Sequence, residues 1–200
     1  MHGATDRALE TFRRHQGLLR TAEAIQLGIA PRTLYELRDA GILVQVSRGL
    51  YRLADLPPLS QPDLVTVALR IPRGIICLIS ALDFHDLTTQ IPHAVYVALP
   101  GDSERPRLSD PPLRLFWFSG QAYTAGVEEH ELDGVPIKIY SLEKTVADCF
   151  KYRNKVGMEV ALEALRRCRE GNRCSLQRLV QFARICRVEK LMHPYLEALA

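Results

Sequence analysis

The chain has 200 residues, 47% of them hydrophobic, and a formal net charge of +3, so it can bury a sizeable core in one domain or in a small domain joined to a medium one. The small positive charge permits an anionic partner without demanding one. No stretch approaches the roughly 20 apolar residues of a membrane span, and the N-terminus lacks the apolar core of a signal peptide, so we expect a cytoplasmic protein that neither spans a membrane nor is secreted.

The charge is unevenly distributed along the chain. Residues 1–55 hold eight Lys and Arg against six Asp and Glu, residues 56–140 hold six against ten, and residues 141–200 hold twelve against seven. A basic excess at both ends suits nucleic acid, although a solvated surface gives the same pattern.

Cysteine usage favours a reducing compartment and no metal. The five cysteines form an odd set without a C-x-x-C pair: Cys77, Cys149, Cys168, Cys174 and Cys186. This pattern is typical of reduced thiols in a cytoplasm. Cys168 and Cys174 lack the usual spacing of paired zinc ligands, so we expect no metal and no cofactor.

The N-terminal residues predict three helices. Residues 5–15 carry one apolar face, made by Ala8, Leu9 and Phe12. A short second helix has Thr21 as its expected N-cap and ends at Gly28. A third begins at Pro31, because the missing N–H of proline would be unsatisfied there anyway, and ends at Gly41.

A hairpin follows these helices. Two short helices joined by a brief turn with glycine are typical of a helix-turn-helix, and the hairpin makes it a winged one. A generic three-helix module with a hairpin is the alternative. We expect alternate side chains of each strand to point toward the core. On the first strand these are Ile42, Val44 and Val46, and on the second Tyr51 and Leu53.

The third helix has two distinct faces. A helical wheel places Leu34 and Leu37 toward the core and puts a polar set on the opposite side: Arg32, Tyr35, Glu36 and Asp39. A solvated amphipathic helix would show the same division. In a helix-turn-helix this polar side would face the DNA groove.

The start of that helix carries the groove-facing candidates. A recognition helix usually reads bases with its N-terminal residues, which favours Arg32, Thr33 and Tyr35. Arg32 could pair bidentately with guanine, and Tyr35 could reach a phosphate or pack on sugar. Glu36 would be repelled by phosphates unless it accepts from a cytosine amine or pairs with Arg32 four residues earlier.

The turn Ser47-Arg48-Gly49 carries an arginine where turn geometry asks only for glycine. A wing tip lies beside the duplex, so Arg48 could reach phosphate or the minor groove. Arg52 and Arg20 would extend this basic strip. The candidate DNA-binding residues are therefore Arg20, Thr21, Arg32, Thr33, Tyr35, Arg48 and Arg52.

The segment "ADLPPLSQPDL", residues 54–64, resists helix and sheet and marks a boundary between a winged helix-turn-helix domain, residues 1–56, and a second domain, residues 57–200. That domain is predicted to have helices over 63–70 and 74–87, strands over 93–100 and 113–120, a hairpin around Asp133-Gly134, and helices from Ser141, over 158–168 and over 176–185. Helices, strands and helices in succession make it a mixed α+β domain, and the whole chain an α+β protein.

Little in the second domain suggests catalysis. Asp83 and Asp86 flank His85 on one predicted helix face, which could mimic part of a metal-assisted hydrolase, but no third ligand follows at a recognisable spacing. Ser80 lacks the G-x-S-x-G elbow and no phosphate-binding loop is present, so we expect no enzyme activity. A cluster of basic residues could be a second anion-binding surface or a solvated helix face: Lys144, Lys151, Arg153 and Lys155.

Three sequence blocks, in this order, resemble the AbiEi family of antitoxins and transcriptional regulators of bacterial type IV toxin-antitoxin systems. They are "LLRTAEAIQLGIAPRTLYELRDAGILVQVSRGLYRLAD", "ISALDFHDLTTQIP" and "IYSLEKTVADCFKYRNKVG". The resemblance covers roughly residues 18 to 165. The role of the helices after residue 165 is left open by it.

The resemblance implies a winged helix-turn-helix that binds double-stranded DNA, at inverted repeats in its own promoter, and represses the operon. It implies an α+β domain that helps to counter a nucleotidyltransferase-like toxin encoded beside it, without a stable complex. The family's DNA-contacting positions carry over onto Arg32, Thr33, Tyr35 and Arg48, and inverted repeats imply dimerisation on DNA.

Two other functions remain open from the sequence. One is a stand-alone winged-helix transcription factor whose C-terminal domain senses a ligand or dimerises. The other is an enzyme that uses Asp83, His85 and Asp86. A neighbouring nucleotidyltransferase gene would separate the antitoxin from the first, and metal-dependent activity lost in Asp83→Ala would favour the second.

Overall fold

The computed structural model describes residues 2–170 and 173–198. The chain divides into two compact units, Met1–Pro62 and Asp63–Ala200. Together they make an α+β protein, as predicted, with a winged helix-turn-helix followed by a mixed α+β unit. The domain limits 1–56 and 57–200, taken as separately folding pieces, stay a prediction.

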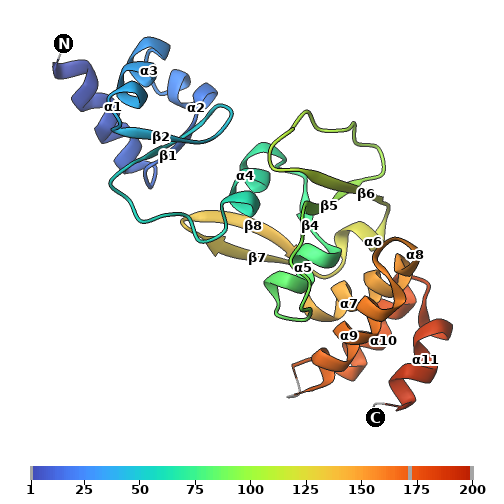
Figure 1. Cartoon of the computed structure of the whole chain (residues 1–200). Helices are drawn as coiled ribbons and strands as arrows, with labels where there is room; N and C mark the ends of the chain where they lie inside the picture. The colour runs from blue at the N-terminus through green and yellow to red at the C-terminus, as the bar shows by residue number, and fades with distance from the viewer. Residues whose placement is uncertain (1, 171–172, 199–200) are drawn as a thin grey trace. The chain divides into compact units, whose positions relative to one another are not determined.

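Between residues 2 and 62, the N-terminal unit consists of three helices and a small antiparallel sheet, drawn in blue and cyan in Figure 1. Its elements are α1 (His2–Arg14), β1 (Leu18–Arg20), α2 (Thr21–Gln26), α3 (Pro31–Asp39), β2 (Leu43–Ser47) and β3 (Leu50–Leu53). β3 lies between β1 and β2 and pairs antiparallel with both. Phe12, Leu34 and Leu43 are among the buried side chains that join the helices to this sheet.

The start of α2 differs from the prediction. Thr21 is the first helical residue, and the N-cap is Arg20, whose extended backbone N–H donates to Glu23 Oε2 at 2.9 Å. Thr21 cannot cap the helix because its backbone N–H and its hydroxyl both donate to the Gly49 carbonyl, at 2.9 and 3.3 Å. The first residue of α2 is therefore bonded to the turn of the wing.

The inward face of the hairpin was predicted wrongly on its first strand. Leu43 is buried, whereas Ile42 and Val44 are 39% and 44% exposed. The Ile42 N–H donates to the Leu37 carbonyl and so closes the end of α3, which delays the strand by one residue. A β-bulge between Gln45 and Ser47 then breaks the alternation.

The second strand of the hairpin, β3, buries the side chains that were predicted to face the core. Tyr51 and Leu53 are both buried, and Leu53 lies opposite Leu43 in the ladder. Gly49, at φ +74°, takes the left-handed turn between the strands. The second strand thus fixes the wing to the core, while the bulge and the turn set the direction of its tip.

The C-terminal unit is built on a five-stranded mixed sheet of order β6-β5-β4-β8-β7. Its strands are β4 (Ile75–Ile76), β5 (Val95–Pro100), β6 (Leu113–Phe118), β7 (Val127–Leu132) and β8 (Val135–Tyr140). Its helices are α4 (Pro62–Arg70), α5 (Leu78–Phe84), α6 (Gln121–Thr124), α7 (Leu142–Lys151), α8 (Arg153–Val156), α9 (Met158–Arg169), α10 (Leu176–Ile185) and α11 (Glu189–Ala198). Within the unit, α7, α9, α10 and α11 lie together beside α5 (Figure 1).

The helix predicted over 74–87 is wrong at its start. Ile75 and Ile76 form β4, which pairs with β5 on one side and with β8 on the other. A two-residue strand gives no periodicity in the sequence, and here tertiary pairing at the centre of the sheet decides the conformation. The helix itself is α5 and begins at Leu78.

A disulfide joins Cys168, at the end of α9, to Cys174, before α10. Their Cα atoms lie 5.4 Å apart, within the range that a disulfide can span. The expectation of five reduced thiols is therefore wrong for this pair. Cys77, Cys149 and Cys186 are free and buried.

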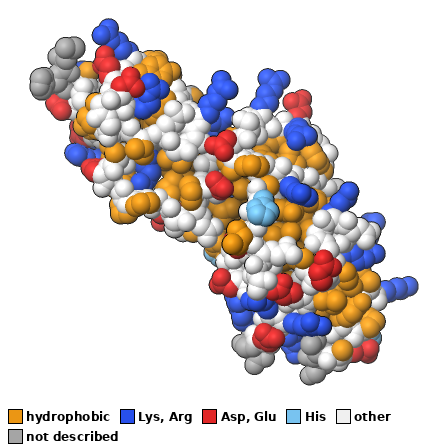
Figure 2. All heavy atoms as spheres, in the orientation of Figure 1, with side chains coloured by type: hydrophobic (Ala, Val, Ile, Leu, Met, Phe, Trp, Pro, Cys, Tyr) orange, Lys and Arg blue, Asp and Glu red, His pale blue; other side chains and the backbone are white. Residues whose placement is uncertain are grey.

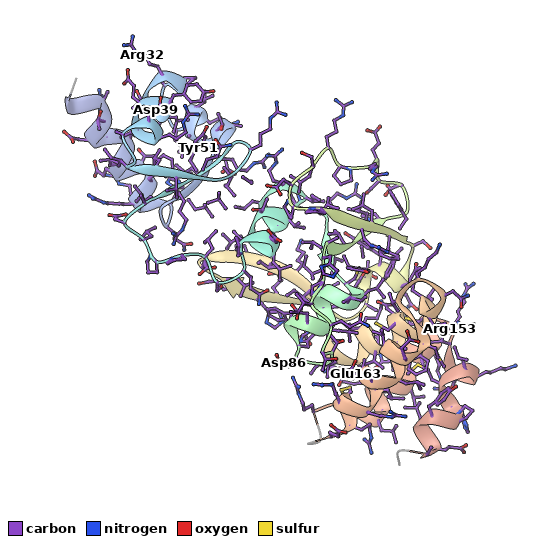
Figure 3. All side chains as sticks on the ribbon, in the orientation of Figure 1. Arg32, Asp39, Tyr51, Asp86, Arg153 and Glu163 are labelled. Carbon is purple, nitrogen blue, oxygen red and sulfur yellow. A yellow bond between two sulfur atoms is a disulfide. The ribbon has the colours of Figure 1, made fainter. Side chains whose placement is uncertain are left out.

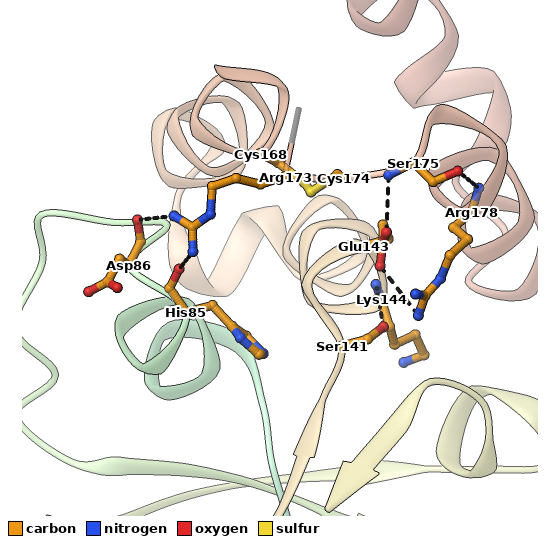
Figure 4. The surroundings of a disulfide bond; sticks show 10 residues. All are labelled: His85, Asp86, Ser141, Glu143, Lys144, Cys168, Arg173, Cys174, Ser175 and Arg178. Atoms are coloured by element: carbon orange, nitrogen blue, oxygen red, sulfur yellow. Dashed lines mark hydrogen bonds and ion pairs between the residues drawn. A yellow bond between two sulfur atoms is a disulfide. The ribbon is translucent and has the colours of Figure 1, made fainter. Parts of the chain in front are cut away.

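The segment beside the disulfide is bonded to the rest of the unit (Figure 4). Arg173 Nη2 donates to the His85 carbonyl at 2.6 Å, and the Ser175 N–H donates to Glu143 Oε1 at 3.1 Å. The approach to α10 is thus tied to both α5 and α7.

In the described ranges 2–170 and 173–198, no helix is both long enough and apolar enough to cross a membrane.

Candidate nucleic-acid interface

The two faces of α3 are as the helical wheel predicts. Leu34 and Leu37 are buried at 1% and 2% exposure. Arg32, Tyr35, Glu36 and Asp39 are exposed on the opposite side. Figure 3 shows the Arg32 side chain extending outward from the start of the helix. The buried leucines therefore fix the helix so that its N-terminal polar residues face solvent.

Arg32 is paired with Glu36 on this exposed face. Arg32 Nε donates to Glu36 Oε1 at 2.7 Å, and the two side chains are 85% and 54% exposed. The geometry is the i, i+4 pairing that the sequence offered as one explanation for Glu36. An exposed pair of this kind is worth only about 0.3 to 0.5 kcal/mol, so Arg32 can leave it for a phosphate or a base at little cost.

Tyr35 has a contact that the sequence reading missed. The Arg38 guanidinium lies over its ring, 5.1 Å from the centroid, and also binds Asp39 at 2.7 Å. The hydrogen bonds that Arg38 donates to the Asp39 carboxylate raise the pKa of Arg38 above its ordinary value. The i, i+3 spacing of Tyr35 and Arg38 was the available signal for this contact. Arg38 limits the directions in which Tyr35 can turn.

The wing presents Arg48 at its tip. Arg48 is exposed, in the turn between β2 and β3, and this turn is held by the bonds from Thr21 to Gly49. Arg20 is half-buried and immediately precedes α2. The bonds from Thr21 to Gly49, together with the pairing of β1 and β3, thus join the wing to the helix-turn-helix and fix their relative placement.

Arg52 and Thr21 also have contacts within the protein. Arg52 is half-buried, and its Nη1 donates to the Leu56 carbonyl at 3.2 Å. Thr21 uses its hydroxyl on Gly49. Thr33 is half-buried and lines a groove of about 470 Å³ with residues of α1.

The surface charge of this unit is mixed. Figure 2 shows basic and acidic side chains lying close to one another on the visible face of the N-terminal unit. All eight of its basic residues are arginines, against six carboxylates. A surface of this kind has little general attraction for a polyanion, so binding of nucleic acid here would depend on a few well-placed arginines.

The residues of the catalytic alternative do not share one environment. His85 is 8% exposed and its Nε2 bonds the Tyr140 carbonyl at 2.8 Å, whereas Asp83 and Asp86 are exposed. Among residues 2–170 and 173–198, no group of three or more His, Cys, Asp or Glu side chains could hold a metal ion. The structure gives the catalytic alternative no support.

The basic cluster of the second unit is divided. Lys144 is fully buried, with its Nζ 2.5 Å from Asp148 Oδ2, so it belongs neither to a solvated face nor to a surface for anions. Lys151 and Lys155 are exposed, and Arg153 donates to the Phe150 carbonyl. The i, i+4 spacing of Lys144 and Asp148 in a helix with an apolar surrounding was the signal for this pair.

The N-terminal unit matches a known family. Residues 6–54 match the family described as transcriptional regulator, AbiEi antitoxin. This confirms the resemblance for the winged helix-turn-helix and supports a role as a transcriptional regulator or antitoxin. The two later sequence blocks lie outside the matched residues. No curated protein matches the chain.

A solved structure shares the fold. The crystal structure of the RV2827C protein from Mycobacterium tuberculosis is similar with a TM-score of 0.61 and 16% sequence identity, over 90% of this chain and 71% of that one. At this identity the likeness shows the fold alone. It extends through both units, so the arrangement of elements after residue 54 also has a counterpart in a solved structure.

Proposed function

We propose that the chain is a DNA-binding transcriptional autorepressor and the antitoxin of a type IV toxin-antitoxin system. The observation that carries the proposal is the family match of residues 6–54, which coincides with a winged unit whose α3 turns Arg32 and Tyr35 outward. The target would be inverted repeats in its own promoter. Two copies would bind each site, because protein symmetry tends to mirror operator symmetry.

Within this proposal the candidate residues take different roles. Arg32, Thr33 and Tyr35 would contact the major groove, and Arg48 would contact phosphate or the minor groove beside it. Arg20 would extend the phosphate contact. Thr21 and Arg52, which bond the wing turn and the Leu56 carbonyl, would act mainly by holding the wing in place.

DNA binding is tested by titrating the chain against its own upstream region and against a scrambled duplex of equal length, at two salt concentrations. We expect the upstream region to bind at least about a thousandfold more tightly, and both affinities to fall with salt. Equal affinity for the two duplexes at both salt concentrations would overturn the repressor role.

The antitoxin role requires a separate experiment. The partner would be a nucleotidyltransferase-like toxin encoded beside this chain and countered without stable binding. Co-expression of the two should restore growth that the toxin alone prevents, while a pull-down recovers no stable complex. Growth that stays arrested with the full-length chain present would overturn the antitoxin role and leave a stand-alone transcription factor.

A further inference from the structure

A basic cavity lies in the C-terminal unit. It has a volume of about 460 Å³ and is lined by three cationic side chains, Lys151, Arg184 and Arg187, together with the residues 119–122 that lead into α6. Lys151 ends α7, and the two arginines lie at and just beyond the end of α10. Three cations from two helices thus surround one hollow of the size of a small-ligand site.

Arg187 occupies a backbone position that ordinarily belongs to glycine. Its φ is +60°, and the bonds from the Arg187 N–H to Arg184 and from the Val188 N–H to Ala183 close α10 in the manner of a Schellman motif. The left-handed residue of that motif is usually glycine, because a side chain there meets a steric penalty. Arg187 is therefore a residue of the cavity that can be changed to glycine without a cost to the backbone.

The cations of the cavity are only partly engaged. Arg184 Nε donates to Glu189 Oε1 at 2.8 Å, in an exposed pair. Within residues 2–170 and 173–198, the side chains of Lys151 and Arg187 form no hydrogen bond or ion pair, and both are exposed. Two cations therefore line the hollow outside any ion pair of the described residues. The buried carboxylate of Asp148, which Lys151 influences through space, is already paired with Lys144. This arrangement favours a bound anion.

An open groove adjoins the cavity along α10. It has a volume of about 860 Å³ and shares Gln121, Arg184 and Ile185 with the cavity. Its other lining residues are apolar or amide side chains: Leu176, Gln177, Val180 and Gln181. Figure 2 shows basic and hydrophobic side chains side by side over the helices of this unit.

The chemistry of the groove complements that of the cavity. Leu176 is 38% exposed and, with Val180 four residues later, gives an apolar shelf on one side of α10. Glutamine amides can both donate to and accept from the edge of a heterocyclic base. An apolar shelf with amides beside a cationic hollow fits a flat, polar ring joined to a chain of phosphates.

We propose that this double site binds a free nucleoside polyphosphate. Lys151, Arg184 and Arg187 would bind the phosphates, and the shelf of α10 would hold the base, with its edge against the glutamine amides. A nucleotide rather than a duplex is the fitting ligand, because the cations surround a small hollow and do not form an extended strip. The site is independent of the DNA interface of the other unit.

The test is calorimetric titration of the full chain, without DNA, by ATP, GTP, inorganic triphosphate and adenosine. We expect at least one of the two nucleotides to bind in the micromolar range, triphosphate to bind more weakly, and adenosine to bind weakest. Arg187→Gly should weaken nucleotide binding about tenfold or more, since it removes a charge-assisted contact. The melting temperature of this variant should stay equal or rise, because glycine favours the backbone at this position.

The matched control is Arg166→Ala. Arg166 is exposed on α9 and does not line the cavity. This change lowers the net charge by the same amount and should leave nucleotide binding unchanged. The proposal is overturned if neither nucleotide binds at millimolar concentration, if triphosphate binds as tightly as both nucleotides, or if Arg187→Gly and Arg166→Ala bind equally well. None of these results bears on the proposed binding of DNA.

Discussion

Arg32 and Arg48 have different tasks at the proposed interface, and this difference can be measured. Arg32 is the second residue of α3, the proposed recognition helix, and can leave Glu36 at little cost. Arg32→Ala should therefore cost about 1 to 3 kcal/mol on the operator and relax its sequence preference. Arg48→Ala should weaken all duplexes more evenly and reduce the salt slope by about one. Gel-shift titrations against operator and scrambled DNA at two salt concentrations separate the two. Parent-like behaviour of both variants would refute their assignment.

The buried pair of Lys144 and Asp148 holds the centre of the second unit. Both side chains are 0% exposed, and the Lys144 Nζ lies 4.0 Å from the centroid of the Tyr140 ring. Burial raises the pKa of Asp148, against the opposing effects of Lys144 and of the Cys186 thiol that donates to it. Asp148 thus depends on its partners for its charge.

Removing one member of this pair should leave an unpaired buried charge. Lys144→Met is expected to lower the free energy of unfolding by about 3 to 5 kcal/mol. The double change Lys144→Met with Asp148→Leu should be much less destabilising, because no charge remains buried. Urea denaturation of the parent, the single variant and the double variant measures this. A single variant that loses under about 1 kcal/mol would show that the pair is not buried as described.

His85 should make the fold sensitive to acid. Burial lowers its pKa below the ordinary 6.5, against the opposing effect of the hydrogen bond to the Tyr140 carbonyl. Below pH 6.5 the unfolded chain therefore takes up a proton that the folded chain refuses, so stability is lost as the pH falls through this value toward the folded pKa. His85→Gln keeps a donor near the same place without titrating. The urea midpoint should fall further between pH 7.5 and pH 5.5 for the parent than for the variant. An equal fall in both proteins would contradict the role of His85.

At the scale of elements, the wing depends on its turn. Gly49 is left-handed at φ +74°, and its carbonyl accepts both bonds from Thr21. Gly49→Ala should cost about 1 to 2 kcal/mol of stability. It should also lower the affinities for operator and for scrambled DNA by similar factors, because it displaces the tip of the wing and leaves α3 in place.

A helical glycine provides the control for the wing. Gly3 lies in α1 with nothing within 4 Å of an added Cβ. Gly3 is the second residue of α1, where glycine costs less than in the middle of a helix, so Gly3→Ala should raise stability by about 0.5 kcal/mol or less and leave DNA binding unaltered. Thermal unfolding and fluorescence anisotropy give both quantities. A change in the ratio of operator to scrambled affinity in Gly49→Ala alone would show that the wing itself reads sequence.

The elements also show which features a sequence can disclose. The face of α3 was predictable because Leu34 and Leu37 repeat at helical spacing, and the proline at its start fixes the phase. The first strand of the hairpin was not, because a β-bulge and the closing bond of Ile42 shift the alternation. Neither feature leaves a trace in local hydrophobicity.

Long-range pairing accounts for most of the other differences. β4 is two residues long and exists because β5 and β8 flank it, which no local window contains. Arg187 could not be singled out from the sequence for a related reason, because its left-handed backbone and its place in a cavity depend on the tertiary structure. The exposed positions of Arg32 and Arg48 could be read from the sequence because one lies on a short amphipathic helix and the other in a turn, whereas contact of the candidate residues with DNA stays a prediction.

At the scale of the whole molecule, the two units have separate cores and distinct chemistry. The N-terminal core joins α1 and α3 to a three-stranded sheet, and the C-terminal core surrounds α7. The family match lies within the first unit, whereas the likeness to a solved structure extends over both. The proposed DNA interface thus lies in the first unit, and the proposed nucleotide site in the second.

The central claim is that the start of α3 and the wing tip contact the same operator. DNase footprinting of the upstream region, with the parent and with the double variant Arg32→Ala/Arg48→Ala, tests it most directly. We predict two protected half-sites of an inverted repeat, about 10 to 10.5 base pairs apart between centres or a multiple of this, and loss of protection in the double variant. An unprotected region with the parent, or equal protection by the double variant at the same concentration, would contradict the claim.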